Sequence, residues 1–243
     1  MRIAKYLANA GVASRRKCEE FIVQGRVTVN GQRIETPATL VTPGKDVVAC
    51  DGQPITLPTS FLTFAFNKPI GYTCTISDPH AEHTIYELLP EKMQSLHYVG
   101  RLDRDTEGLL LLTNDGGLEQ AITHPSFEIE KRYIALCKGS FDHVMERQLQ
   151  AGIQDAGEYL RAKRVRARAS QEPGCIIIEM VLTEGHKREV RRLCAAVGLR
   201  VLRLRRLSVG SVQLNGLAPG EYRQLGEAEL QALKSLAFGN HHA

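Results

Sequence analysis

The sequence predicts an α+β protein in which a small N-terminal helix-helix-hairpin domain precedes a larger domain with a mixed, largely antiparallel sheet. A chain of 243 residues fits one large and one small domain, since about 100 to 200 residues per domain is usual. Helix and strand patterns do not alternate regularly along the chain, which disfavours a doubly wound parallel sheet. The segment DGQPITLPTS contains prolines and little periodicity, as linkers do. We therefore expect domains at residues 1–56 and 60–243.

The N-terminal domain is expected to contain two short helices followed by hairpins. RIAKYLANAG places apolar residues at helical spacing and ends at a glycine. Ser14 can cap a second helix, SRRKCEEFIVQG, which ends at Gly25. Short alternating strands follow and are interrupted at Asn30-Gly31 and Asp51-Gly52, pairs that suit tight hairpin turns.

The larger domain begins with an apolar strand, FLTFAF. TIYELLP has a capping-box pattern of Thr84 and Glu87, which is typical of a helix start. KRYIALCKG and CIIIEMVLTEG read as strands, and DHVMERQLQAG reads as a helix capped by Asp142. In EGHKREVRRLCAAVG the apolar residues recur at helical spacing and predict a helix that ends at Gly198, with its arginines on the opposite side.

The composition and the motifs that are missing argue against several classes of protein. The start MRIAKYLANAG has no signal-peptide pattern, and the longest aliphatic run, GLLLL, is far shorter than the ~20 residues of a membrane span, so we expect a cytoplasmic protein without a membrane partner. Six cysteines occur without a CxxC pair, which argues against a zinc site. There is no GxSxG, GxxxxGK[ST] or GxGxxG motif. We expect no metal site and a monomeric chain.

Basic residues are concentrated in three segments, although the net charge is only +4. Residues 1–56 hold eight Lys and Arg against five Asp and Glu. Residues 161–168 hold five basic residues and no acid, and residues 186–206 hold eight against one acid. Three such segments in one chain favour a polyanionic partner, of which nucleic acid is the commonest.

The segment GRLDRDTEG concentrates Asp103, Asp105 and Glu107 beside Arg101 and Arg104. In an extended chain the three acids share a face, which would suit a two-metal nuclease. Two carboxylates about 5 to 9 Å apart would suit a glycosidase. A third hypothesis also accounts for the arginines: one essential aspartate acts on a ribosyl centre, and arginines pair with it to keep it ionised.

GRLDRDTEGLLLLTNDG resembles the signature of pseudouridine synthases, specifically the RsuA/RluB family that modifies ribosomal RNA. NKPIGYTCT, HPSFEIEKRYIA, EGHKREVRRLCAAVG and LAPGEYRQL also appear in the expected order. The N-terminal SRR…GRVTVNG pattern resembles the RNA-binding module of ribosomal protein S-four. The resemblance implies a pseudouridine synthase catalytic domain that isomerises a flipped-out uridine and requires no cofactor. One departure is Glu189, where many relatives have Gln.

The resemblance also implies roles for particular residues. Asp103 would be the catalytic carboxylate, Tyr133 would pack on the target base and assist proton removal, and Arg191 would be the partner of Asp103. Basic residues would bind RNA, and those expected to do so are Arg15, Arg16, Lys17, Arg26, Lys68, Arg101, Lys187, Arg188 and Arg192.

The wording of the motifs is closest to the RluB-like, large-subunit members of the family, so the expected partner is ribosomal RNA or an assembling ribosomal subunit. Small-subunit ribosomal RNA and tRNA are alternative substrates. Two other classes remain: a non-catalytic RNA-binding or ribosome-assembly protein, in which Asp103, Tyr133 and Arg191 would be idle, and a metal-dependent nuclease.

Overall fold

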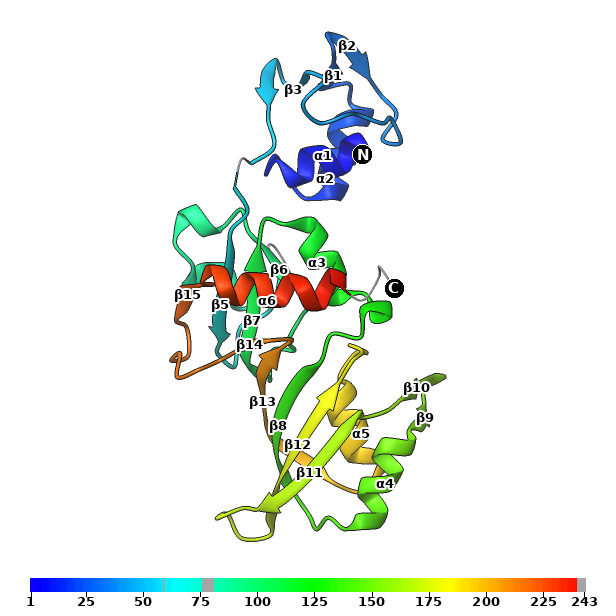
Figure 1. The fold of residues 1–243 in the computed structure, drawn as a ribbon, viewed down its shortest axis with the longest axis vertical. Helices are drawn as coiled ribbons and strands as arrows, with labels where there is room; N and C mark the ends of the chain where they lie inside the picture. Colours follow the sequence, from blue (N-terminus) through cyan, green and yellow to red (C-terminus); the bar gives the residue numbers. More distant parts are fainter. Residues whose placement is uncertain (59, 76–80, 240–243) are drawn as a thin grey trace. The chain divides into compact units, whose positions relative to one another are not determined.

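The computed structural model describes residues 1–58, 60–75 and 81–239 (Figure 1). The chain forms two compact units. The first comprises Met1–Leu62 with Asn114–Gly116, and the second comprises Thr63–Thr113 with the chain from Gly117 onward. Along the chain, the main segment of the first unit ends at Leu62, slightly beyond the linker expected from the prolines. Within the described part of the chain, none of the helices combines the length and the apolar character needed to span a bilayer.

The first unit contains two helices and a four-stranded antiparallel sheet of order β2-β1-β3-β4, which confirms the helix-helix-hairpin prediction. Its elements are α1 (Ile3–Asn9), α2 (Arg15–Val23), β1 (Val27–Val29), β2 (Gln32–Ile34), β3 (Val48–Cys50) and β4 (Gln53–Ile55). The Ser14 side chain caps α2 by accepting a hydrogen bond from the Lys17 N–H at 3.3 Å. Apolar side chains of both helices, such as Leu7 and Ile22, are fully buried against the sheet.

The second unit is built on a nine-stranded sheet of order β11-β12-β8-β13-β7-β5-β15, with β14 paired to β13 and β6 to β7. Its strands are β5 (Thr63–Lys68), β6 (His97–Val99), β7 (Glu107–Thr113), β8 (Lys131–Lys138), β11 (Arg164–Ala169), β12 (Cys175–Leu182), β13 (Arg200–Val209), β14 (Val212–Gln213) and β15 (Tyr222–Gln224). All pairs are antiparallel except β7 with β13. This sheet confirms the α+β prediction. A separate hairpin joins β9 (Ile153–Asp155) to β10 (Glu158–Leu160).

Helices pack on this sheet in two groups, which Figure 1 shows as α4 and α5 on one part and α6 on another. The helices are α3 (Gly116–Thr123), α4 (His143–Ala151), α5 (Glu189–Ala196) and α6 (Glu227–Phe238). Asp142 caps α4 as expected, because its carboxylate accepts from Val144 N at 2.8 Å and Met145 N at 2.9 Å. TIYELLP forms only a 3₁₀ turn, Ile85–Leu88, because Pro90 follows too closely for a longer helix.

Strand β7 explains the four consecutive leucines after the acidic segment. Side chains alternate between the two faces of a strand. Leu109 and Leu111 pack with α3 and α6 on one face, whereas Leu110 and Leu112 pack with the 3₁₀ turns Ile85–Leu88 and Glu91–Met93 on the other. All four are completely buried. The strand is therefore covered on both faces, and it holds the acidic segment that precedes it in a fixed place.

Candidate active site

A cavity of about 530 Å³ opens in the second unit beside the start of β7. Its wall combines the turn that carries Asp103, the start of β8 with Tyr133, the loop between β12 and α5, and Arg206 of β13. Of the residues expected in the site, those that line this cavity are Arg101, Asp103, Tyr133, Lys187 and Arg188. Segments far apart in the sequence thus bring the expected carboxylate and the expected aromatic ring to one place.

Asp103 lies in a tight turn whose backbone is held from within. Its carbonyl oxygen accepts from Thr106 N at 3.0 Å and from Lys68 Nζ at 3.1 Å. About a third of its side chain is exposed to the cavity and solvent. The turn therefore presents a carboxylate to a ligand while its own backbone stays fixed.

Lys68, which was expected to bind RNA, holds this turn from inside the protein, where its ammonium group is not exposed to a phosphate. Its side chain is fully buried. Nζ donates to the carbonyl oxygens of Pro69 at 3.0 Å, Asp103 at 3.1 Å and Thr106 at 2.8 Å, which uses its three donors. Burial lowers the pKa of Lys68. The lysine joins the end of β5 to the turn that precedes β7.

The arginines near Asp103 are arranged differently from the expectation. Arg188 Nη1 lies 4.0 Å from Asp103 Oδ2, and its Nη2 lies 3.2 Å from Asp105 Oδ2. Arg191 pairs with Asp105 Oδ2 at 3.1 Å and donates to Asp105 O at 2.9 Å and Val201 O at 3.4 Å. The expected Arg191–Asp103 ion pair is therefore replaced, among the described residues, by one from Arg188. Arg191 lies within α5 and is largely buried, whereas Arg188 precedes the helix at φ +54° and extends over the cavity.

Tyr133 forms part of the cavity wall. The ring is partly buried and packs against two apolar clusters on one face of the sheet, one with α4 and α5 and one with Leu110 and Leu112 of β7. The guanidinium carbon of Arg206 lies 6.0 Å from the ring centroid, and Arg206 Nη1 donates to the Tyr133 hydroxyl at 3.5 Å. Arg206 was not among the residues expected in the site. The available signal was alternation in β13, where Leu204, Arg206 and Ser208 occupy the buried side.

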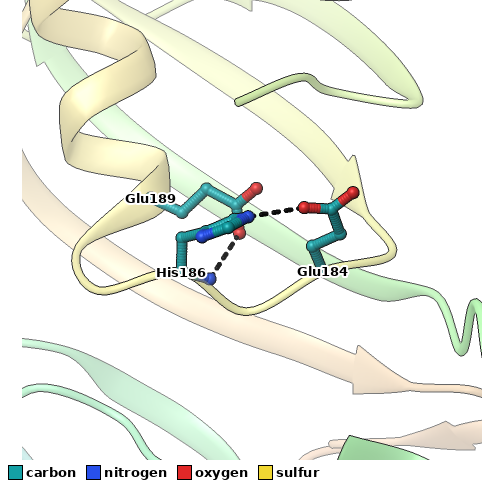
Figure 2. Close-up of side chains that lie close together, drawn as sticks. All are labelled: Glu184, His186 and Glu189. Atoms are coloured by element: carbon teal, nitrogen blue, oxygen red, sulfur yellow. Dashed lines mark hydrogen bonds and ion pairs between the residues drawn. The ribbon is translucent and has the colours of Figure 1, made fainter. Parts of the chain in front are cut away.

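Glu184, His186 and Glu189 form, among the described residues, the group of His, Cys, Asp or Glu that is close enough to hold a metal ion (Figure 2). Both ring nitrogens of His186 already contact carboxylates, Nδ1 to Glu158 at 3.0 Å and Nε2 to Glu184 at 2.6 Å. Burial opposes a charge on the ring, but these hydrogen bonds outweigh it and raise the pKa of His186. The arrangement suits a protonated histidine between two carboxylates better than a metal ligand.

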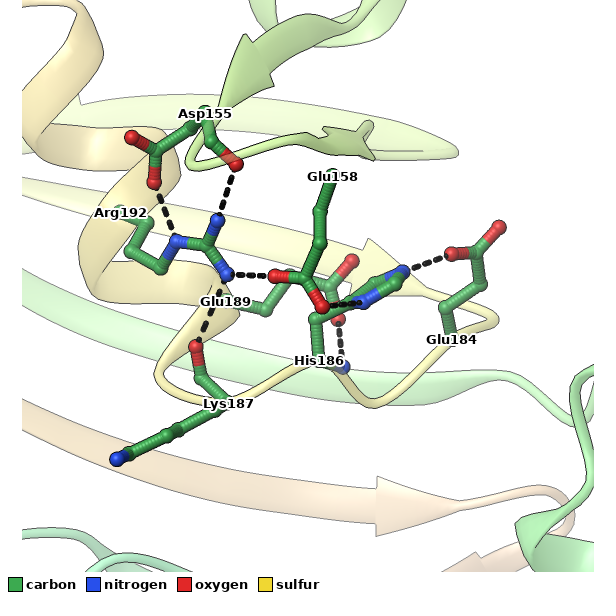
Figure 3. A network of polar contacts seen from close by, with 7 residues as sticks. All are labelled: Asp155, Glu158, Glu184, His186, Lys187, Glu189 and Arg192. Atoms are coloured by element: carbon green, nitrogen blue, oxygen red, sulfur yellow. Dashed lines mark hydrogen bonds and ion pairs between the residues drawn. The ribbon is translucent and has the colours of Figure 1, made fainter.

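Arg192, which was expected to bind RNA, extends this network (Figure 3). It forms ion pairs with Asp155 and Glu158, and its Nη2 donates to Asp155 O at 2.6 Å. Because Glu158 also contacts His186, the network ties the β9–β10 hairpin to the start of α5. Two carboxylates neutralise the guanidinium, so the expected phosphate contact would require Arg192 to leave these partners. Its neighbour Lys187 is exposed and lines the cavity.

Glu189 is an ionisable group buried at the start of α5. It is 5% exposed; one carboxylate oxygen accepts from His186 N at 3.2 Å, and the other has no hydrogen-bond partner in the described chain. Burial raises the pKa of Glu189 to about 7. His186 and Lys131 lower this pKa, whereas the negative charge of Glu184 raises it further. The carboxyl is therefore protonated more readily when the protein is folded than when it is unfolded.

Glu189→Gln should make stability less dependent on pH. Because folding raises this pKa, the contribution of Glu189 is fully present below pH ~4.5 and is lost as pH rises through about 7. At about 1.4 kcal/mol per pKa unit, the wild type should lose up to about 3 kcal/mol relative to the variant between pH 4.5 and pH 8. Urea unfolding of both proteins at the two pH values measures this loss.

Glu172→Gln, at an exposed position, is the matched control. The difference in free energy of unfolding between this variant and the wild type should be the same at both pH values. A Glu189→Gln protein whose stability parallels that of the wild type at all pH values would contradict the raised pKa.

In the first unit, the residues that are expected to bind phosphate differ in the contacts they make within the protein. Arg15 and Arg16 are exposed on α2, and Arg15 pairs with Glu19 at 3.5 Å within the helix. Lys17 pairs with Glu20 at 2.6 Å. Arg26 donates to Asp51 Oδ1 at 2.9 Å, and its guanidinium lies 3.9 Å from the Phe21 ring centroid. Arg26 is thus held by an acid and an aromatic ring within its own unit.

Comparison with known proteins identifies the class of both units. A family described as RNA pseudouridylate synthase matches residues 63–196, and the S4 domain family matches residues 1–47. A crystal structure of a pseudouridylate synthase superposes with a TM-score of 0.67 at 28% identity, covering 96% of this chain and 99% of that one. The chain therefore belongs to the RNA pseudouridine synthase family, and it is an isomerase that acts on RNA.

Relatives with sequence similarity over nearly the full chain agree with this class. An uncharacterized RNA pseudouridine synthase of Aquifex aeolicus (strain VF5) is 38% identical over 96% of this chain and 93% of its own length. Ribosomal large subunit pseudouridine synthase B of Bacillus subtilis (strain 168) is 36% identical over 97% of this chain and 96% of its own length. The chain is thus similar throughout both units to an enzyme named for the large ribosomal subunit.

Proposed function

We propose that this protein converts one uridine of large-subunit ribosomal RNA to pseudouridine, with Asp103 as the reacting carboxylate. The observation that carries the proposal is the cavity in which Asp103, Tyr133 and Arg188 meet. Similarity to the Bacillus subtilis large-subunit enzyme over 97% of this chain supports the choice of RNA. The enzyme would act in the cytoplasm as a monomer, on ribosomal RNA or on an assembling subunit.

The reaction needs an ionised carboxylate beside ribose. The bond from ribose C1′ to uracil N1 breaks, the ring turns, and a bond from C1′ to C5 forms while the C5 proton is lost. Asp103 acts either on C1′ or on the neighbouring ribose carbon. The positive charge of Arg188, 4.0 Å away, is a counter-charge for the carboxylate. Nothing is oxidised and no group leaves the RNA, so the proposal requires no cofactor or metal.

Tyr133 supplies a surface for the target base. An aromatic ring can stack on uracil, and its hydroxyl can reach the ring edge. The uridine must first leave its helix, at a cost of a few kcal/mol. Exposed cations at the cavity, Arg101 and Lys187, would offset this cost by binding phosphate.

Arg191 acts through Asp105 in this proposal. Its guanidinium binds the Asp105 backbone and carboxylate, two residues after Asp103, and also the β13 carbonyl of Val201. It therefore fixes the reactive turn against β13, and we class it as a positioning residue. Arg188 takes the role of the nearest cation to Asp103.

Mapping pseudouridine in ribosomal RNA from cells with and without this protein tests the substrate. We expect the loss of one pseudouridine in the large-subunit RNA. A site lost instead from small-subunit RNA or tRNA would overturn the proposed substrate, and an unchanged map would overturn the proposed function.

The N-terminal unit is proposed to bind RNA backbone through Arg15 and Arg16. Replacing both with glutamine should reduce the slope of log affinity against log salt by about 0.7 to 0.9 for each phosphate that the protein no longer neutralises. Filter binding of a ribosomal RNA fragment across a salt series measures the slope. Lys45→Gln, at an exposed lysine of the same unit, is the control and should keep the wild-type slope. A double variant with an unchanged slope would show that these arginines do not bind phosphate.

A further inference from the structure

Arg206 is a buried cation in the cavity wall that the proposed mechanism has not used. It is 3% exposed. Its Nε donates to Leu109 O at 2.7 Å, its Nη1 reaches the Tyr133 hydroxyl at 3.5 Å, and its Nη2 has no hydrogen-bond partner in the part of the chain that the structure describes. Among the described residues no carboxylate lies within 4.0 Å of this guanidinium. A buried charge without a partner is costly, which suggests that a ligand completes it.

The position of Arg206 is fixed by the sheet on both sides. Arg206 lies opposite Gly108 in the parallel β7–β13 pair and opposite Tyr133 in the β8–β13 pair. Gly108 has φ +109°, and a Cβ added there would lie 2.3 Å from Arg206 O. The glycine after the acidic segment therefore allows β13 to approach closely. Arg206 and Tyr133 are cross-strand neighbours, so a base stacked on Tyr133 would lie beside the guanidinium.

A second buried cation faces the same cavity. Lys131 is 8% exposed and lines the wall, and its Nζ donates to Ile129 O at 3.1 Å and Thr183 O at 3.4 Å. Burial, and then the positive charge of Arg206, lower the pKa of Lys131 to about 8. A negative charge in the cavity would relieve this repulsion. Arg206 and Lys131 thus make this part of the wall complementary to an anion.

We propose that Arg206 contacts the target uracil and stabilises the negative charge that forms on the ring when the glycosidic bond breaks. This inference rests on the proposed function. When C1′–N1 breaks, its electron pair passes to N1 and is shared with the two carbonyl oxygens of uracil. The pair at C5 then forms the new bond to C1′, the C5 proton leaves, and N1 gains a proton. With respect to the described residues, Arg206 has an unused donor and an uncompensated positive charge, and both are available to the negatively charged ring.

The test measures how one substitution, Arg206→Gln, changes the conversion rate of two target nucleosides, uridine and 5-fluorouridine. Arg206→Gln should slow single-turnover conversion of uridine by about 100-fold or more, the scale of losing one charge-stabilising donor, while RNA affinity changes little. The probe is a transcript of the RNA around the mapped uridine. A second transcript carries 5-fluorouridine at that position, because fluorine withdraws electrons and already stabilises the ring anion. Disappearance of the original nucleoside is measured by mass spectrometry of digested RNA.

Arg206→Gln should slow consumption of 5-fluorouridine much less than that of uridine. Equal slowing of both substrates would show a merely structural role, and no slowing would show that Arg206 does not act; either result overturns the inference. Should the Gln variant not fold, Arg206→Lys makes the same comparison, because its displaced charge should also slow uridine more than 5-fluorouridine. Arg147→Gln, exposed on α4, is the control. A wild type inactive on uridine would refute the proposed function instead.

Discussion

Asp103→Asn is expected to abolish pseudouridine formation while RNA binding survives. The amide keeps the shape of the side chain but has neither the negative charge nor the nucleophilicity that the proposed step at ribose requires. The rate should fall by at least about 10⁴-fold, the scale of removing a reacting group. The turn should keep its structure, because Lys68 and Thr106 bind the backbone carbonyl of Asp103 and not its carboxylate. Single-turnover kinetics and filter binding measure both effects.

Two neighbouring acids provide the controls for this variant. Asp105→Asn retains the backbone carbonyl that Arg191 binds, and Glu107→Gln lies at the start of β7. Both should cost far less activity than Asp103→Asn. Comparable losses at all three positions, with activity restored by added Mg²⁺, would favour a metal-dependent nuclease and contradict the proposed role of Asp103.

Lys68→Met is expected to impair both stability and catalysis. Methionine has a similar length but no donors, so the carbonyl oxygens of Pro69, Asp103 and Thr106 would lose their buried partner. Unsatisfied buried groups cost about 1 to 3 kcal/mol each, so the free energy of unfolding should fall by about 3 kcal/mol or more. In the folded fraction the turn would be less well placed, and the single-turnover rate should fall by about 10- to 100-fold.

RNA affinity separates this role from a phosphate contact. The affinity of folded Lys68→Met protein should equal that of the wild type, and its salt dependence should be unchanged. Lys138→Met, at an exposed lysine of β8, should keep wild-type stability. A Lys68→Met protein that is as stable and as active as the wild type would show that the three hydrogen bonds do not hold the turn.

Local patterns predicted much of the fold. The Ser14 and Asp142 caps both appear in the structure, because a cap depends on residues that are adjacent in the chain. The four leucines of β7 stand out in the sequence as an aliphatic run, but their burial on both faces depends on helices that come from elsewhere in the chain. Helices α3 and α6 were not predicted, and the capping-box turn at Thr84 was expected to begin a longer helix.

The site was less predictable because it depends on which way side chains point. The motif resemblance selected Asp103 and Tyr133, and both residues line the cavity in the structure. It could not distinguish Arg188, Arg191 and Arg192, which differ only in their position around the start of α5. Nor could it predict a fully buried Lys68, since lysines are almost never fully buried.

The central claim is that this protein isomerises uridine by means of Asp103. The most direct test incubates the purified protein with large-subunit ribosomal RNA, both protein-free and in partially assembled subunits, in the presence of EDTA. Wild-type protein should form pseudouridine at one position in intact RNA chains, and Asp103→Asn protein should form none. Chain scission, activity only with added metal, or equal pseudouridine formation by the Asp103→Asn protein would contradict the account.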